Sequence, residues 1–406
     1  MSSRSSSRLF YGWINVLCGA LILGVSHGVV TNCFSLYIIP VSQDLGVSRE
    51  AFSFIALIVN ALYALVSFLS GHLFERFRVI SLIRAASVVL PLSYFCFSLC
   101  SGLASFYLCA VVVGLSVSLI TFLPFTLIIS NWFIRHRGRA LGLCFMGSGL
   151  GGMVMNFFSS ALIEGFGWRS SYQLVALIMA AVMVPLSFLV IRATPQEKHL
   201  LPLGFDDAAG TALFGPLASQ AIPTLSFAML VLLSLIVGFT STVYGNVINP
   251  HLRDLGFSPL YASSVLSLYL GALAAAKILL GSLYDRIGAR NGTLVSMLGF
   301  ILGFLGVFLG KALWSIPLIL LGGLGTASSN VSYPVLTRFA FGTRDFTRLN
   351  GLLMGMNFVT CSIGTVCANL IYSATGSYNA VLFLCMGLCA LVIAILPLIR
   401  PVSQTH

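Results

Sequence analysis

Twelve apolar stretches, separated by short polar segments, are the feature that most limits how this chain can fold. A membrane-spanning helix needs about 20 predominantly apolar residues. Stretches of that kind lie near residues 11–39, 50–71, 80–101, 103–130, 138–162, 167–191, 225–249, 259–283, 292–310, 312–336, 347–372 and 377–399. With 58% hydrophobic and 8% charged residues, the chain is too apolar for a soluble core of this length. We therefore expect an all-α integral membrane protein with twelve transmembrane helices.

An internal repeat relates the two halves of the chain. The motif Gly-x-Leu-aromatic-acid-Arg ends an apolar stretch at residues 71–76 and returns at residues 281–286, 210 positions later. The same offset relates residues 44–48 to residues 254–258. Similarity at one fixed offset indicates that a whole unit has been duplicated. The expected architecture is two pseudo-symmetric six-helix bundles.

The longest polar segment, residues 192–224, separates the two repeats and contains the acidic pair Asp206-Asp207. Its length lets the second repeat begin on the same membrane side as the first, which gives parallel repeats. We predict an N-terminal bundle over 1–191, a cytoplasmic linker over 192–224 and a C-terminal bundle over 225–406. The acidic pair is interpreted as a solvated part of this linker.

Basic residues are distributed unequally between the two sides of the predicted helices. If the N-terminus is cytoplasmic, sixteen of the 21 Lys and Arg residues lie in cytoplasmic segments, and the opposite side holds only Arg49, Arg169, Arg253 and Lys311. Because cytoplasmic loops favour Lys and Arg, we expect both termini to lie in the cytoplasm. We also expect the protein to be a monomer in the plasma (inner) membrane. The net charge of +11 then needs no nucleic-acid partner, since no basic run lies in a soluble module.

The sequence offers no set of residues for enzymatic chemistry. It contains no Ser/His/Asp set, no HExxH motif, no phosphate-binding loop and no paired carboxylates in a predicted span. Its ten cysteines are scattered through apolar stretches without metal-binding spacing, as small buried residues would be. We therefore expect no enzymatic activity, no metal site and no cofactor.

Several motifs resemble those of one transporter family over the whole length of the chain. Besides the repeated 71–76 and 281–286 motif, they are Tyr11-Gly12-Trp13, the run Trp132-Phe133-x-x-x-Arg137-Gly138-Arg139, Gly167-Trp168-Arg169 and Lys277-x-x-x-Gly281. The chain resembles the major facilitator superfamily, and within it the branch of oxalate/formate antiporters and monocarboxylate transporters. The resemblance implies a secondary transporter that moves a small molecule between its two bundles.

Lys277 is the only charged residue deep inside a predicted span. An unpaired ammonium at the centre of a bilayer costs roughly 2.5–3.5 kcal/mol on insertion scales. Since no Asp or Glu lies at a comparable depth, a substrate carboxylate is one candidate partner. The alternative is a structural lysine that extends to the cytoplasmic interface.

Departures from the family pattern limit which carboxylates are expected as substrates and which residues could couple transport to protons. In the resembled branch an arginine usually stands at the position of Lys277, and lysine offers a point charge where arginine offers a bidentate fork. The second basic residue that the oxalate branch implies in the eleventh span is absent from residues 353–360, which disfavours a dicarboxylate as small as oxalate. Leu273 occupies the place of the aspartate that monocarboxylate transporters use for proton coupling. Any proton coupling is then left to His27, which is alternatively a packing residue, or to Lys277 itself.

Polar residues recur at helical spacing in several spans and could line one central cavity. The candidate substrate-binding residues are Lys277, His27, Thr31, Asn60, Tyr63, Asn246, Asn330, Tyr333 and Asn357. The competing interpretation of each neutral member is a hydrogen bond between packed helices.

The repeated motif also predicts a conformational latch. Its candidate residues are Gly71, Glu75, Arg76, Gly281, Asp285 and Arg286. The two glycines would let helices approach closely, and the two acids could pair with Arg137, Arg139, Arg344 or Arg348 in one alternating-access state only. The alternative is ordinary charge at a helix end, which contributes little.

The predicted function is secondary active transport of a small organic anion, in particular a monocarboxylate, as symport with protons or as antiport. A first alternative is an exporter of a neutral or lipophilic compound with the same fold. A second is a non-transporting membrane sensor, which would be expected to carry an added soluble signalling domain.

Overall fold

The computed structural model describes residues 10–205, 215–311 and 314–400, and these residues are almost entirely helical. In the first half the elements are α1 (Tyr11–Val25), the π-helix η1 (Gly28–Asn32), α2 (Phe34–Leu45), α3 (Arg49–Arg76), α4 (Val79–Phe97), α5 (Leu103–Ser118), α6 (Phe122–Trp132), α7 (Arg137–Pro185) and the π-helix η2 (Leu186–Val190). The connecting segment holds the short helices η3 (Pro195–Lys198) and α8 (Ala218–Ala221). In the second half they are α9 (Leu225–Asp254), α10 (Pro259–Phe308), α11 (Ser315–Phe341), α12 (Phe346–Thr375), α13 (Asn379–Ile395) and η4 (Leu396–Leu398). The acidic pair Asp206-Asp207 lies outside the described residues.

The helices account for twelve membrane crossings. Nine helical segments of the described chain are long and apolar enough to span a membrane. Two of them, within α7 and α10, turn at Gly167 (φ 79°) and Gly288 (φ 81°), a backbone region that glycine adopts without a Cβ penalty. Each of these two therefore makes two crossings, and α11, with 27 residues, supplies the twelfth. The predicted all-α class of integral membrane protein is confirmed.

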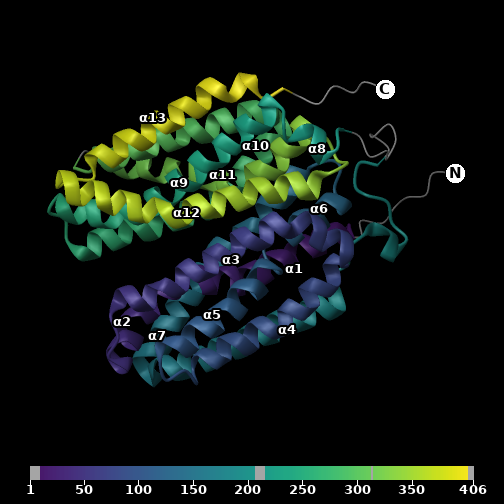
Figure 1. Cartoon of the computed structure of the whole chain (residues 1–406). Helices are drawn as coiled ribbons and strands as arrows, with labels where there is room; N and C mark the ends of the chain where they lie inside the picture. The colour runs from purple at the N-terminus through teal and green to yellow at the C-terminus, as the bar shows by residue number, and fades with distance from the viewer. Residues whose placement is uncertain (1–9, 206–214, 312–313, 401–406) are drawn as a thin grey trace.

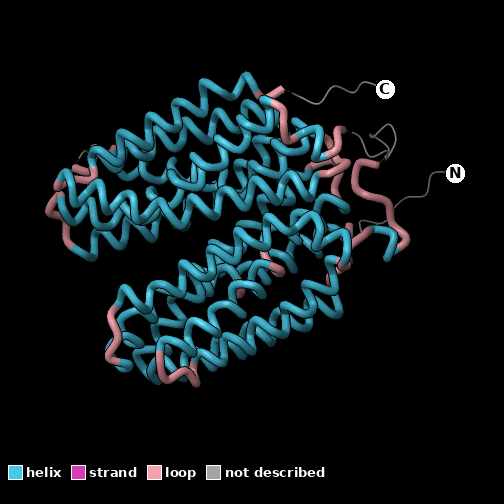
Figure 2. The backbone as a smooth tube through the Cα atoms, viewed as in Figure 1, coloured by secondary structure: helices cyan, strands magenta, loops and turns pink. Residues whose placement is uncertain are grey.

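The helices form two bundles that meet at one end of the molecule. Figure 1 shows α1 to α7 in one bundle and α9 to α13 in the other. The bundles approach each other where α6 and α8 lie and diverge toward the end where α2 lies. In Figure 2 the long loop of the connecting segment is at the end where they meet, which we call the linker end.

Glycines make the approach of α7 to α10 possible. A Cβ on Gly281 would collide with the carbonyl oxygen of Gly138, and one on Gly142 would collide with that of Lys277. Toward the far end the seam continues to Gly149, where a Cβ would lie 3.3 Å from that of Ala274. At Gly271, which lies about one turn before Ala274 and further from the linker end, a Cβ would meet open space. The close glycine contacts of this seam therefore extend from the linker end to position 274 of α10.

The second seam joins α3 to α12 in the same way. A Cβ on Gly71 would lie 3.0 Å from the Cβ of Arg348, and one on Gly351 would collide with Ser70. Further from the linker end the rings of Tyr63 and Phe358 stack, with centroids 4.6 Å apart. The two seams are equivalent under the internal repeat, so both halves contribute alike to closing this end.

Three of the aromatic motifs hold helix ends in place. Trp13 packs edge-on against Phe133 with ring centroids 4.8 Å apart, and the Trp132 indole donates to the carbonyl oxygen of Arg192 at 2.9 Å. At the other end of the bundle, Arg169 forms an ion pair of 2.5 Å with Asp44. These residues explain three of the family-like motifs as structural elements.

Candidate functional site

Lys277 lies in α10 at the α7 seam, with its ammonium directed toward the first half. Its Nζ donates to the Ser148 hydroxyl at 2.7 Å and to the Phe145 carbonyl oxygen at 3.2 Å. The Phe122 ring lies 5.9 Å from Nζ, within the range of a cation–π contact. The side chain is only 5% exposed, and no other Lys, Arg, Asp or Glu of the described chain is equally buried. Its partners are all neutral, so the positive charge is solvated but not neutralised.

His27, Tyr63 and Thr31 form a second group in the first half, beside Phe122. The His27 Nδ1 lies 3.0 Å from the Tyr63 hydroxyl and 3.4 Å from the Thr31 hydroxyl. The His27 ring is edge-on to Phe122, with centroids 4.7 Å apart. Phe122 therefore contacts both His27 and the Lys277 ammonium, and His27 in turn contacts Tyr63 and Thr31.

The π-helix η1 changes the direction of the helix between His27 and Thr31. π-bulges of this kind occur frequently at functional sites. Gly28, its first residue, packs so closely on α7 that a Cβ would meet the backbone nitrogen of Gly152 at 2.6 Å. Thr31 is left exposed as a result of its position in this turn. Glycine packing at Gly28 thus holds this turn of the first span against the α7 backbone.

Asn60 of α3 lines a cavity together with Thr31. The cavity has a volume of about 50 Å³ and penetrates the first bundle. Its lining residues are Val30, Thr31, Phe34, Ile55, Ala56, Val59, Asn60, Tyr94, Phe97, Val113 and Tyr172. We call it the Thr31–Asn60 pocket.

The candidates of the second half are distributed differently. Asn357 donates to the Tyr333 hydroxyl at 2.6 Å, and both side chains are buried. Asn330 donates to its neighbour Ser329 at 3.2 Å, and Asn246 is exposed in the span of α9. The structure therefore joins Tyr333 to Asn357 by an interhelical hydrogen bond, whereas the Lys277 ammonium bonds to Ser148 and Phe145 of the first half.

Residues without a polar signal in the sequence complete the surroundings of Lys277. Phe122 and Phe145 beside Lys277 were not singled out, because an aromatic residue in an apolar span resembles any packing residue. Ser148 lies between two glycines in the fifth span, and a small hydroxyl residue in a glycine-rich stretch at a helix seam is the one signal that could have indicated it.

The latch residues are not equivalent in the structure, although their sequences are. Asp285 accepts the backbone N–H groups of Gly138 at 2.9 Å and of Arg139 at 2.8 Å. These are the first free N–H groups of α7, where the helix dipole favours a negative charge. Asp285 therefore caps a helix of the opposite bundle, and the partners are backbone groups where we expected arginine side chains.

Glu75, the counterpart of Asp285, differs from it. The Glu75 side chain is exposed and has no hydrogen bond or ion pair within the described residues. Arg76 and Arg286 are exposed as well. In the α3–α12 seam the Ser70 hydroxyl instead donates to the carbonyl oxygen of Thr347 at 3.4 Å. Of the two repeated acids, only Asp285 therefore bonds to the opposite bundle within the described residues.

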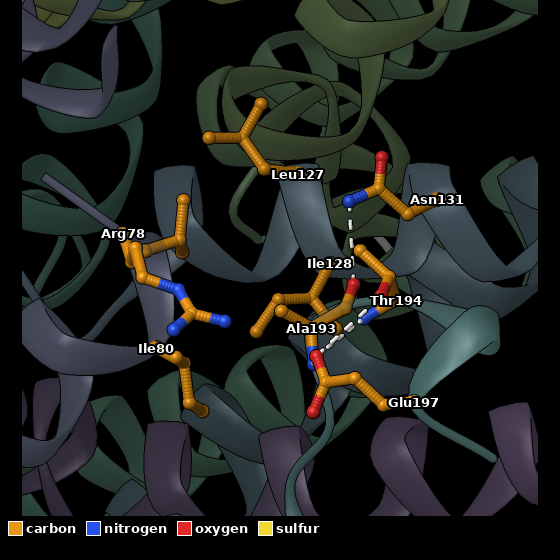
Figure 3. Close-up of a pocket in the computed structure, with 9 residues that line it drawn as sticks. Arg78, Ile80, Leu127, Ile128, Asn131, Ala193, Thr194 and Glu197 are labelled. Atoms are coloured by element: carbon orange, nitrogen blue, oxygen red, sulfur yellow. Dashed lines mark hydrogen bonds between the residues drawn. The ribbon is translucent and has the colours of Figure 1, made fainter. Parts of the chain in front are cut away.

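A larger cavity of about 270 Å³ lies at the linker end of the first bundle (Figure 3). Arg78 points into it from one side, and Glu197 lies on the other, where its carboxylate accepts the backbone N–H groups of Ala193 and Thr194. Asn131 donates to the Ala193 carbonyl oxygen at 3.2 Å. None of the candidate site residues lines this cavity.

Two helical bundles that meet at one end through glycine seams, beside a buried charge, have the fold of known membrane transporters. A family model described as the Major Facilitator Superfamily matches residues 20–243 and 230–406. The chain belongs to this superfamily, and it is a multi-pass integral membrane protein. The predicted family is confirmed.

Named relatives extend over nearly the whole chain at low identity. One is an uncharacterized MFS-type transporter YcxA of Bacillus subtilis, 23% identical, covering 96% of this chain and 97% of that protein. Another is human monocarboxylate transporter 12, also 23% identical, covering 92% of this chain and 78% of that protein. Among solved structures, the Escherichia coli fucose:proton symporter FucP in its outward conformation has a TM-score of 0.72 at 15% identity, covering 97% of this chain and 100% of that one. The similarity to the FucP structure concerns the fold alone.

Proposed function

We propose that the protein is a secondary active transporter of a small organic anion, in particular a monocarboxylate. The observation that carries this proposal is the buried Lys277 ammonium, whose hydrogen-bond partners Ser148 and Phe145 are neutral. A charge in the membrane interior that lacks a protein counter-ion is favourably paired with an anionic ligand. A single carboxylate would supply the charge-assisted hydrogen bond that the site lacks.

The names of the relatives support the same substrate class. Human monocarboxylate transporter 12 aligns with 92% of this chain. A lone lysine also fits one carboxylate better than two, since residues 353–360 of α12 contain no second basic residue. A monocarboxylate therefore fits the site better than a short dicarboxylate.

We propose that the structure represents the outward-open state. The positive-inside distribution of Lys and Arg supports a cytoplasmic linker in a protein of the plasma (inner) membrane. The seams at Gly138–Gly281 and Gly71–Arg348 close this linker end. Alternating access then requires the bundles over 1–191 and 225–406 to separate here and to approach at the opposite end, about the linker over 192–224.

A neutral or lipophilic substrate is the second candidate, and the Thr31–Asn60 pocket favours it because aromatic and aliphatic side chains form most of its wall. Comparing each acid of a panel with its uncharged carboxamide in thermal unfolding of the detergent-purified protein separates the two candidates. A ligand that binds only the folded state raises the melting temperature. We expect a shift with at least one acid and none with its amide. Equal shifts for acid and amide would instead favour the neutral substrate.

The site also predicts the mode of coupling. Leu273 stands one turn from Lys277, and no carboxylate of the described spans reaches the ammonium. A second substrate anion is therefore the most direct way to neutralise Lys277 while the transporter returns to its starting state. We expect uptake into proteoliposomes preloaded with the same acid to be at least as fast as proton-driven uptake into empty ones. Fast gradient-driven uptake into empty vesicles that survives His27→Ala, without stimulation by preloading, would contradict exchange and assign proton transfer to Lys277.

A further inference from the structure

The Thr31–Asn60 pocket begins one helical turn beyond the His27–Tyr63 pair on both helices that supply this pair. His27 and Thr31 are four residues apart on the first membrane span, and Asn60 precedes Tyr63 by three residues on α3. The His27–Tyr63 hydrogen bond of 3.0 Å joins the two helices below the pocket. Since Tyr63 also stacks on Phe358 of the other bundle, the pocket lies directly beyond the place where the two bundles meet.

The mouth of the pocket is polar and its interior is apolar. Thr31 is exposed and Asn60 is half-buried, and the Asn60 amide has no hydrogen-bond partner within the described residues. Behind them the wall consists of Phe34, Phe97 and Val113, with the rings of Tyr94 and Tyr172. A wall of this kind attracts hydrocarbon, and polar groups at its mouth orient the part of a ligand that enters.

The volume of the pocket limits what it can hold. A water-sized group needs roughly 10–15 Å³ of such volume, so about 50 Å³ accommodates roughly three to five of these groups. The phenyl ring of Phe97, 4% exposed, and the Val113 side chain, 1% exposed, close its inner side. The pocket therefore suits a short hydrocarbon end and excludes a bulky ring system.

Successive contacts through two aromatic rings connect the Lys277 ammonium to the pocket. Nζ lies 5.9 Å from the Phe122 centroid, the Phe122 and His27 centroids are 4.7 Å apart, and Thr31 at the pocket lies next to His27. Lys277 does not line the pocket, so we expect a two-carbon acid bound at Lys277 to leave the pocket empty. An acid with a longer chain can run over Phe122 and His27, which are apolar on their faces, and end inside the pocket.

We propose that the Thr31–Asn60 pocket holds the hydrocarbon end of the substrate, so that the transporter selects medium-chain monocarboxylates over the shortest ones. This inference rests on the proposed function and specifies its substrate class. Affinity should rise only once the chain is long enough to enter the pocket. Each methylene that enters should then lower the inhibition constant about fourfold, until the pocket is full.

The test is a homologous series of unbranched 2-oxo acids from three to nine carbons, which stay ionised and cross lipid slowly. Each acid is assayed as a competitor of labelled acid exchange in proteoliposomes. We expect the inhibition constant to be nearly constant for the shortest acids and then to fall by at least about tenfold over two or three carbons. A constant value throughout the series, with Lys277-dependent exchange intact, overturns this inference and leaves the proposed function standing. Absence of any acid exchange overturns both.

Two variants and one control tie the chain-length effect to the pocket. Ala56→Leu fills the pocket from α3, so the ratio between the short-chain and long-chain constants should fall toward one. Ala61→Leu adds the same atoms to an exposed position of α3 outside the pocket lining and should keep the wild-type ratio. Val113→Ala enlarges the pocket and should move the optimum to longer chains, which provides a test should Ala56→Leu fail to fold. An unchanged optimum in Val113→Ala, or an equal loss of the ratio in Ala61→Leu, contradicts the assignment.

Discussion

Replacing Lys277 by glutamine is expected to lower transport of the organic anion by roughly 10- to 100-fold or more. A hydrogen bond to a charged group contributes about 1.5–3 kcal/mol, and 1.4 kcal/mol corresponds to a factor of ten. Glutamine retains polar atoms near Ser148 and Phe145 but removes the charge. The measurement is initial uptake into proteoliposomes with equal amounts of reconstituted, monodisperse protein.

Two further variants test whether the loss of transport comes from the charge of Lys277 or would follow from the removal of any lysine. Lys277→Arg should retain part of the activity, because it keeps the charge while changing its shape and donor geometry. Lys311→Gln removes an exposed lysine that lies between α10 and α11 and should behave like the wild type. Full transport by Lys277→Gln would show that the buried ammonium has only a structural role in the α7–α10 seam.

Replacing Asp285 by asparagine is expected to shift the protein toward a state that is open at the linker end. The two carboxylate oxygens accept N–H groups of Gly138 and Arg139 from the opposite bundle. An acid at a helix N-terminus on the surface contributes up to about 1 kcal/mol, which corresponds to a roughly fivefold change in the ratio of the two states. The measurement is labelling of Ser67→Cys by a membrane-impermeant thiol reagent from the linker side, in a variant without the native cysteines.

Glu75→Gln is the matched control for this variant. Glu75 occupies the equivalent place in the repeat, but its side chain has no partner in the described chain. It should change the labelling of Ser67→Cys much less than Asp285→Asn does. Equal labelling in both variants would contradict a one-sided latch, and unchanged labelling in Asp285→Asn would leave its carboxylate as an ordinary helix-end charge.

The class of fold was predictable because both hydropathy and the internal repeat can be read directly from the order of residues. The apolar stretches gave the number of crossings, and the offset between residues 71–76 and 281–286 gave the duplication. The boundaries were less predictable, since α7 and α10 each run through two crossings with a turn at Gly167 or Gly288. At each of these turns a single glycine at positive φ takes the place of a polar loop. Hydropathy alone does not distinguish a glycine turn from a polar loop.

The site was less predictable than the fold because it depends on contacts between the two bundles. The isolation of Lys277 is visible in the sequence, whereas its pairing with Ser148 across the seam is a property of the packing. The repeat even suggested the wrong symmetry for the latch, since Asp285 and Glu75 share a motif but only Asp285 reaches a helix end. Backbone N–H groups leave no trace in the sequence, which is why arginine side chains were expected as partners.

Uptake of a labelled monocarboxylate panel by the purified protein in proteoliposomes tests the central claim most directly. Protein-free liposomes give the passive rate, and Lys277→Gln protein gives the rate that does not depend on the buried charge. The account predicts saturable uptake of at least one monocarboxylate that falls nearly to the passive rate in Lys277→Gln. Saturable uptake of neutral solutes alone, with every monocarboxylate at the passive rate, would contradict it.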